Sequence, residues 1–216
     1  MKSNGDRIDH RVIAELIAPR SSVLDLGCGD GELLRLLIKE KNVRAQGIEI
    51  DEGAIYKCVA KGLNVFHGDI DSGLAEYQDK SFDYVILNQS LQQVRRVETV
   101  LEDALRVGRK VIVGFPNFAH YRARWQLFFL GRAPVTGALP YQWHETPNLH
   151  FLSISDFRSY CRLKDIVIER AEYFSVGKRV VFSPNLSAQV GIFLISNRFS
   201  RRIVPGSNPG VLSARP

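Results

Sequence analysis

The chain has 216 residues, of which 45% are hydrophobic and 24% charged, and its formal net charge is +6. This size predicts one domain with its own core, and the ordinary composition excludes disordered, collagen-like and coiled-coil proteins. Three widely spaced cysteines, Cys28, Cys58 and Cys161, exclude a disulfide framework. We see no secretory signal and no apolar run approaching the ~20 residues of a membrane span, so we expect a cytoplasmic protein without a membrane partner.

Short apolar runs alternate with helical patterns through the first half of the chain. The predicted helices are 7–18, 32–39, 52–61 and 97–107, and the predicted strands are 22–26, 43–48, 63–66, 82–87 and 110–113. Strands that alternate with helices of this length are typical of a parallel sheet with helices on both faces.

The alternation stops at Pro116, where an aromatic-rich insert begins. This insert, residues 117–150, contains seven Phe, Tyr and Trp residues and three prolines. We predict a helix over 119–130 and a loop over the remainder. Irregular segments of this length are typical of lids, binding loops and partner surfaces, and the sequence leaves these alternatives open.

The chain returns to regular patterns after the insert. We predict a helix over 155–161 with Ser155 as its N-cap, followed by strands over 166–171 and 190–195 that pair antiparallel at the sheet edge. The predicted fold class is therefore α/β: a Rossmann-like, seven-stranded, mostly parallel sheet with helices on both faces and one antiparallel edge strand. We expect one domain over 1–196 and a disordered C-terminal tail over 197–216.

The positive charge is concentrated in that tail. Residues 197–216 contain four arginines and no acidic residue, which supplies +4 of the net +6. Residues 1–116 have an excess of two acidic side chains. A nucleic-acid partner needs a basic surface on the folded domain, so this distribution argues against one.

A glycine-rich loop lies where the first predicted strand turns into the next helix. Residues 25–32 read Asp-Leu-Gly-Cys-Gly-Asp-Gly-Glu, with glycines at Gly27, Gly29 and Gly31. The third glycine follows the second by two places, whereas the dinucleotide fingerprint has three. The acidic residues here, which are Asp25, Asp30 and Glu32, would repel a pyrophosphate and attract a cation. S-adenosylmethionine presents such cations, an ammonium and a sulfonium.

Two further acidic residues follow the next two predicted strands. Glu49 lies 18 residues after Gly31, the position of a ribose ligand in a βαβ nucleotide site, and Ile50 follows it. Asp69 follows the third strand, where it is suited to accept a hydrogen bond from an adenine amino group while Ile70 packs on the ring. Ligands of open α/β sheets bind at these strand ends. This favours a nucleotide site over the alternative that the acidic residues only cap the helices that follow the strands.

With these motifs the chain resembles the class I S-adenosylmethionine-dependent methyltransferases from about residue 12 to residue 195. Residues 25–31 match the first motif of that superfamily, Glu49 its ribose position and 82–88 its fourth-strand motif. The resemblance implies that Asn88 begins the segment that faces the methyl group. It implies a cofactor, S-adenosyl-L-methionine or S-adenosyl-L-homocysteine, held by Asp25, Gly27, Cys28, Gly29, Gly31, Glu49, Ile50, Asp69, Ile70 and Asn88.

The sequence assigns no catalytic residue. Residues 88–94 lack the Asn-Pro-Pro-Tyr type of motif of base aminomethylases, and no helix shows a His/Glu metal pattern. The acidic neighbours of Cys28 would raise its pKa, which argues against a nucleophile. The candidate bases in the insert are His120, Tyr121, Tyr141, His144 and His150, and for each a packing or surface role is more common.

The insert itself resembles the MetW family of methionine biosynthesis proteins. The likeness runs through residues 114–122, 131–136, 139–143 and 146–150 and continues into 155–157. It implies a protein on a methyltransferase fold that supports homoserine O-acyltransferase, its partner in methionine synthesis. The alternative is an active S-adenosylmethionine-dependent O- or N-methyltransferase of a small molecule, with the insert as a lid over the substrate.

Overall fold

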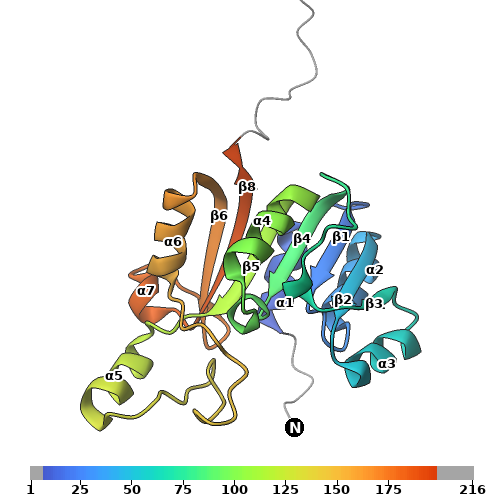
Figure 1. Ribbon diagram of the computed structural model, residues 1–216. Coiled ribbons are helices and arrows are strands. Elements are labelled where there is room, and N and C mark those ends of the chain that lie inside the picture. The colour runs from blue at the N-terminus through green and yellow to red at the C-terminus, as the bar shows by residue number, and fades with distance from the viewer. Residues whose placement is uncertain (1–6, 199–216) are drawn as a thin grey trace, which may run out of the picture.

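The computed structural model describes residues 7–198 and contains one eight-stranded sheet with helices on both faces (Figure 1). The strands are β1 (Ser22–Leu26), β2 (Arg44–Glu49), β3 (Val65–His67), β4 (Phe82–Asn88), β5 (Gly108–Pro116), β6 (Ile166–Ser175), β7 (Lys178–Arg179) and β8 (Val190–Asn197). The helices are α1 (Ile8–Leu16), α2 (Glu32–Lys41), α3 (Glu52–Ala60), α4 (Val97–Val107), α5 (Tyr121–Leu130), α6 (Ile154–Leu163) and α7 (Pro184–Ser187). Two 3₁₀ turns, η1 (Ile70–Ser72) and η2 (Leu91–Gln93), follow β3 and β4.

The strand order is β3-β2-β1-β4-β5-β8-β6-β7, which confirms the predicted Rossmann-like class. Strands β1 to β5 pair in parallel, and β8 lies antiparallel between β5 and β6. The predicted antiparallel pair of late strands is therefore present as β6 and β8. The eighth strand is β7, which adds two residues antiparallel to the end of β6 and is too short to show a sequence pattern.

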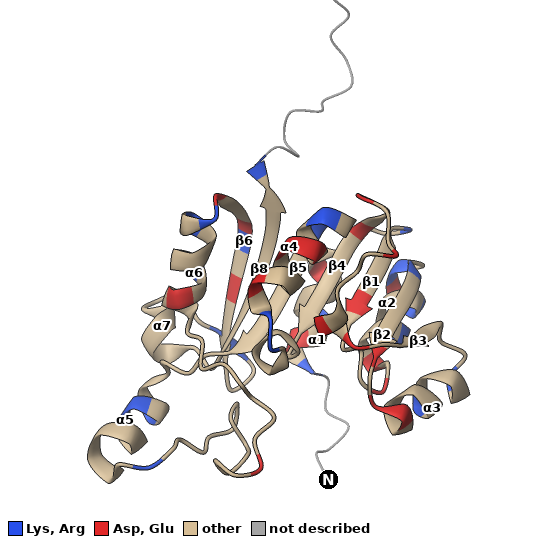
Figure 2. Cartoon of the chain, in the orientation of Figure 1, with Lys and Arg blue, Asp and Glu red and all other residues tan. Residues whose placement is uncertain are grey.

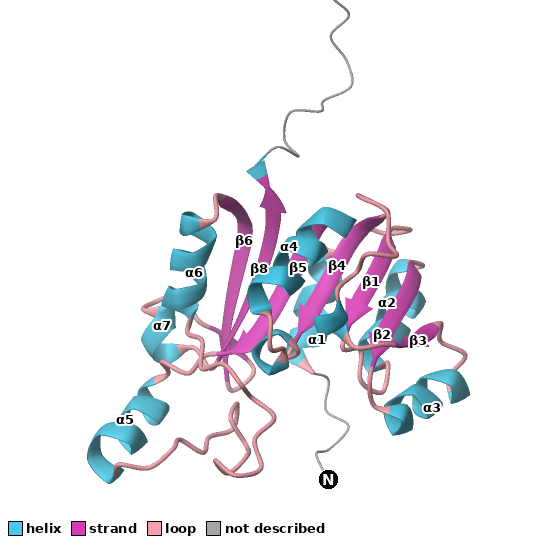
Figure 3. Cartoon of the chain, viewed as in Figure 1, coloured by secondary structure: helices cyan, strands magenta, loops and turns pink. Residues whose placement is uncertain are grey.

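Two apolar layers cover the two faces of the sheet. Leu24 and Leu26 of β1 point into one layer together with α4 and α6, while Val23 points into the other together with α1 and α2. Both faces are covered, so the central strands are apolar at consecutive positions and do not alternate with polar residues. Helices therefore lie on both sides of the strands (Figure 3).

Helix α6 begins earlier than predicted, and its N-cap is Ser153 and not Ser155. The Ser153 hydroxyl accepts a hydrogen bond from the backbone N–H of Asp156 at 3.1 Å. The Asp156 carboxylate in turn accepts one from the backbone N–H of Ser153 at 3.1 Å. This reciprocal capping box satisfies two N–H groups, whereas Ser155 lies within the first helical turn.

The insert contains one helix, as predicted, and α5 is followed by a loop up to residue 150. Helix α5 begins at Tyr121, two residues later than predicted, and ends before Gly131, whose φ of 58° stops the helix. Of the predicted tail, Asn197 still belongs to β8 and Arg198 pairs with Asp165 at 2.6 Å. The remaining tail residues, 199–216, lie outside the described part of the chain.

No helix within residues 7–198 combines the length and the apolar character that crossing a membrane requires.

Candidate functional site

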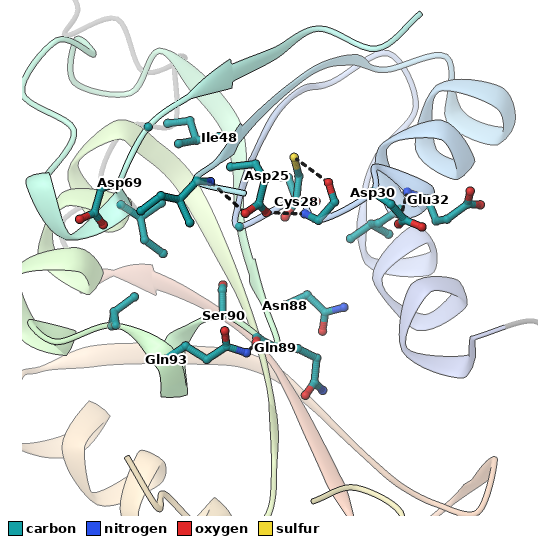
Figure 4. Close-up of a pocket in the computed structure, with 18 of the residues that line it drawn as sticks. Asp25, Cys28, Asp30, Glu32, Ile48, Asp69, Asn88, Gln89, Ser90 and Gln93 are labelled. Atoms are coloured by element: carbon teal, nitrogen blue, oxygen red, sulfur yellow. Dashed lines mark hydrogen bonds between the residues drawn. The ribbon is translucent and has the colours of Figure 1, made fainter. Parts of the chain in front are cut away.

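A cavity of about 710 Å³ opens at the carboxyl ends of β1, β2 and β4 (Figure 4). Nine of the ten predicted cofactor residues line it: Asp25, Gly27, Cys28, Gly29, Glu49, Ile50, Asp69, Ile70 and Asn88. They come together because parallel strands end at the same edge of the sheet. Acidic residues gather at this edge, around the ends of β1 and β2 (Figure 2).

The glycine loop turns sharply from β1 into α2. The backbone N–H groups of Gly27 and Cys28 both donate to the Ile48 carbonyl, at 2.8 and 3.2 Å, which ties the loop to β2. Gly27 and Gly29 adopt φ values of 77° and 55°. A Cβ on Gly29 would meet no atom within 4 Å, so this stretch of backbone is open to a ligand.

Gly31, the tenth predicted residue, is not among the residues that line the cavity. Its φ is 77°, and a Cβ there would overlap Leu63 and come within 2.8 Å of the Cys58 sulfur. Gly31 therefore allows α3 and the following loop to pack against the start of α2, and its place in the motif is explained by packing.

Asp25 is the most buried acidic group of the site. Asp25 is the second-last residue of β1, directly before the glycine loop, and it is 2% exposed. Burial, and after it the charge of Glu49, raise the pKa of Asp25 to about 7, whereas Arg7 opposes the shift. The carboxyl of Asp25 thus changes its charge close to neutral pH.

The Glu49 carboxylate is held in place at the end of β2 by backbone donors. One oxygen accepts hydrogen bonds from the N–H groups of Ile50 and Asp51 at 2.9 and 3.0 Å. The other accepts from Gly29 at 2.7 Å, which joins β2 to the glycine loop. Each carboxylate oxygen has two lone pairs, so the oxygen that accepts from Ile50 and Asp51 is fully used, whereas the oxygen that accepts from Gly29 retains capacity for a ribose hydroxyl.

Asp69 and two isoleucines, Ile50 and Ile70, line the cavity where the chain leaves β2 and β3. The Asp69 carboxylate accepts from the N–H of Asp71 at 2.9 Å and thereby caps η1. Ile70 is partly buried against the main core, whereas Ile50 is largely exposed. The arrangement combines an acceptor with apolar side chains, as a purine ring with an amino group requires.

The thiol of Cys28 is not suited to nucleophilic chemistry. Burial, followed by the charge of Asp25, raises its pKa well above the ordinary value of a thiol. The residue is 8% exposed, and its sulfur occupies the space that a Cβ on Gly47 would need. These contacts give Cys28 a packing role against Gly47, in addition to its place in the lining of the cavity.

The first turn of α1 contributes side chains that sequence reasoning missed. Asp9 accepts hydrogen bonds from Arg7 at 2.7 Å and from the amide of Asn88 at 3.0 Å, and Arg7 and His10 line the cavity. Burial and the charge of Arg7 lower the pKa of His10, which favours the neutral imidazole. The sequence feature that could have revealed this contribution is the polar pair Asp9-His10, which lies in a helix whose other buried residues are apolar.

Two acceptors at the cavity have no partner within the described chain. They are the amide oxygen of Asn88 and the hydroxyl of Ser90, both buried and both on residues that line the cavity. A Cβ on Gly114 would collide with the Asn88 oxygen, so this oxygen lies against Gly114 of β5, which leaves space for it but gives it no hydrogen bond. Buried polar groups are normally paired, so these two atoms are exceptions among the residues that line the cavity.

A second cavity of about 1,070 Å³ adjoins the first on the side of the insert. Arg7, His10 and Tyr141 line both cavities, and Gly137, Pro140 and Asn148 of the insert line the second.

Among the candidate bases of the insert, the structure brings Tyr141 alone to the two cavities. His120 instead caps α5, where its Nδ1 accepts from Arg122 at 3.3 Å.

Comparison with known proteins identifies the family. The model of the family described as "Methionine biosynthesis protein MetW" matches residues 7–195. The "Bifunctional methionine biosynthesis protein MetXA/MetW" of Rhodopirellula baltica is 36% identical over 198 residues, which are 86% of this chain and 32% of the relative. The chain thus spans about a third of the length of that relative.

Solved structures of low sequence identity share the fold. A methyltransferase dependent on S-adenosylmethionine from Mesorhizobium loti aligns with a TM-score of 0.65 at 14% identity, covering 88% of this chain and 97% of that one. Another from Archaeoglobus fulgidus aligns with 0.62 at 15% identity, covering 86% and 93%. The [4+2]-cyclase SpnF also aligns with 0.62 at 15% identity, covering 87% and 80%, so the fold alone does not fix the reaction. The family match and the identity to the relative are decisive where the fold is not, and this chain belongs to the MetW family of methionine biosynthesis proteins.

Proposed function

We propose that the chain binds S-adenosyl-L-methionine, or its product S-adenosyl-L-homocysteine, in the cavity at the glycine loop. The observation that carries the proposal is the convergence of Asp25, Glu49 and Asp69, from three consecutive strand ends, on one cavity. In this proposal Asp25 faces the cationic part of the ligand, Glu49 accepts from the ribose hydroxyls, and Asp69 accepts from the adenine amino group.

The chemistry of the cavity fits this ligand. The backbone at Gly29 is free of side-chain obstruction, and the carboxylates that line the cavity match a ligand that carries an ammonium donor. The acidic residues of the loop disfavour a ligand with phosphates at the same place. When bound, S-adenosylmethionine supplies an electrophilic methyl group on its sulfonium, whereas S-adenosylhomocysteine supplies none.

We further propose that the protein supports homoserine O-acyltransferase in methionine synthesis. The name of the Rhodopirellula baltica relative joins MetXA and MetW in one bifunctional chain. In this proposal the MetXA part corresponds to the homoserine O-acyltransferase that the family resemblance implies as partner, and in that relative the two parts share one chain. We propose that the same pair associates in the present case, and that the ligand site reports the pathway product to the acyltransferase.

Calorimetric titration with S-adenosylmethionine and with S-adenosylhomocysteine tests the ligand site. Glu49→Gln removes the charge but keeps the shape of the side chain, and we expect it to weaken binding about 10-fold or more. Glu52→Gln, which removes an exposed acid in the first turn of α3, serves as the matched control and should bind as the wild type does. Equal affinity of Glu49→Gln and the wild type, or no binding by the wild type, would refute the site.

The supporting role is tested separately by the rate of purified homoserine O-acyltransferase with and without this chain. We expect a change in rate that depends on the concentration of the added protein. An unchanged rate, together with transfer of a labelled methyl group to a metabolite in an extract, would favour the alternative of an active methyltransferase.

A further inference from the structure

Helix α5 exposes an unusual number of large apolar side chains. Trp125 is 53% exposed and Phe128 is 82% exposed, and Phe129 beside them is also exposed. Of the ten residues of this helix, Ala123 alone is buried. Figure 1 shows that α5 projects away from the sheet, and within residues 7–198 no other helix or strand makes an extensive contact with it.

Such a helix is poorly stabilised by its own chain. Isolated helices shorter than about 12–15 residues are marginal in water, and most helices gain their stability by packing one face on a core. Here the fixed points are the His120 cap and Gln126, whose amide exchanges hydrogen bonds of 2.9 and 2.8 Å with the backbone of Val135. These bonds orient the helix but bury none of its aromatic side chains, so the apolar surface is available to a second molecule.

The apolar surface continues on the loop and carries positive charge around it. The exposed aromatic residues of the helix, Tyr121, Trp125, Phe128 and Phe129, form what we call the α5 surface, and Trp143 and Phe151 in the following loop are also largely exposed. The insert, residues 117–150, contains three arginines and a single acidic residue, Glu145. Aromatic side chains and arginines dominate the energetic centres of protein interfaces. The composition therefore fits a docking site whose partner offers apolar pockets with acidic residues around them.

We infer that the α5 surface is the docking site for homoserine O-acyltransferase. This inference rests on the proposed function and adds to it the place of contact. In the Rhodopirellula baltica relative the MetXA and MetW parts occur in one chain, which keeps such surfaces at high effective concentration. A second copy of this chain is the less favourable occupant, because a symmetric contact would bring the arginines of two inserts against one another.

The test measures the affinity of the purified full chain for the homoserine O-acyltransferase of the same organism. Substitution of two exposed aromatics, Phe128→Ala and Phe129→Ala together, should weaken binding about 30-fold or more. Tyr56→Ala removes a comparably exposed aromatic, 73% exposed, from α3 at the opposite end of the sheet (Figure 1) and should leave binding unchanged. Charge reversal by Arg132→Glu should weaken binding most at low salt.

The possible failures are distinguishable. If the wild type does not bind the acyltransferase at all, the proposed partnership fails and this inference fails with it. If the wild type binds and the double variant binds equally well, the partnership stands and the α5 surface is refuted. If the chain alone forms dimers that the double variant loses, while acyltransferase binding is unchanged, the occupant is a second copy and the inference is overturned. Unchanged far-UV circular dichroism and unchanged S-adenosylmethionine affinity show that the variant is folded.

Discussion

Replacing Asp25 by asparagine is expected to stabilise the folded chain at alkaline pH while removing a charge on which ligand binding rests. In the folded chain the pKa of Asp25 is raised from 3.8 to about 7, first by burial and then by the charge of Glu49. An ionised Asp25 therefore costs folding free energy, and asparagine has a similar shape without that charge. The variant separates a group kept for function from a group kept for stability.

The sign and size of the effect follow from proton linkage. Between pH 3.8 and about 7 the folded state binds the Asp25 proton more tightly than the unfolded state, so the wild type loses stability as the pH rises. With about 1.4 kcal/mol for each pKa unit, the cost approaches about 4 kcal/mol at pH 8. At pH 5 most folded molecules hold the proton, and the same relation gives a cost of about 2 kcal/mol.

Urea denaturation of wild type and Asp25→Asn, followed by circular dichroism at pH 8 and at pH 5, measures this cost. The free energy of unfolding should favour the variant at pH 8, and its advantage should shrink by about 2–3 kcal/mol at pH 5. Effects of the substitution that do not depend on pH cancel in this comparison. Asp30→Asn, in the same loop but exposed, controls for the loss of one negative charge. An advantage of equal size at both pH values would refute the reasoning.

Two further predictions concern the loop and the insert. Gly31→Ala should destabilise the chain by about 2–4 kcal/mol in urea denaturation, because the φ of Gly31 is 77° and a Cβ there would overlap Leu63. Gly29→Ala should cost about 1–2 kcal/mol and chiefly weaken S-adenosylmethionine binding. Equal losses of stability in the two variants would contradict the packing role of Gly31. A saturating amount of acyltransferase should change the dissociation constant for S-adenosylmethionine, because the insert lines both cavities. By linkage, the ligand should change the affinity for the acyltransferase by the same factor. Calorimetry that shows no change in either affinity would mean that the two binding sites are not coupled.

The part of the site formed by strand ends could be predicted from the sequence. A short apolar run fixes where a strand ends, and in a parallel sheet all such ends meet at one edge. The sequence pattern therefore predicts that Asp25, Glu49 and Asp69 lie near one another, and in the structure all three line one cavity. The role of Gly31 was not predictable in this way, because the side chain that a Cβ there would overlap belongs to Leu63, in the loop after α3, and no sequence pattern links the two residues.

The contributions of α1 depended on tertiary contacts that leave little trace in the sequence. Asp9 meets Asn88 across 79 positions of the chain, and neither residue belongs to a recognisable motif with the other. The N-cap of α6 was mistaken for a related reason. Ser153 and Ser155 are both acceptable caps, and Asp156 favours Ser153, because its carboxylate accepts a hydrogen bond from the Ser153 backbone N–H.

The insert shows why composition alone could not separate a lid from a partner surface. Its aromatic content is typical of either role, and the structure places the aromatic side chains of different stretches in different surroundings. The backbone N–H groups of Leu149 and His150 donate to the Gln92 carbonyl at 2.9 and 3.1 Å, which holds the end of the loop beside η2, while Tyr141 lines both cavities. Gln126 and Val135 exchange two hydrogen bonds beside α5 that bury no aromatic side chain, and Phe128 faces solvent. Which aromatic side chains line a cavity and which stay exposed thus depends on tertiary contacts that no hydrophobic pattern reveals.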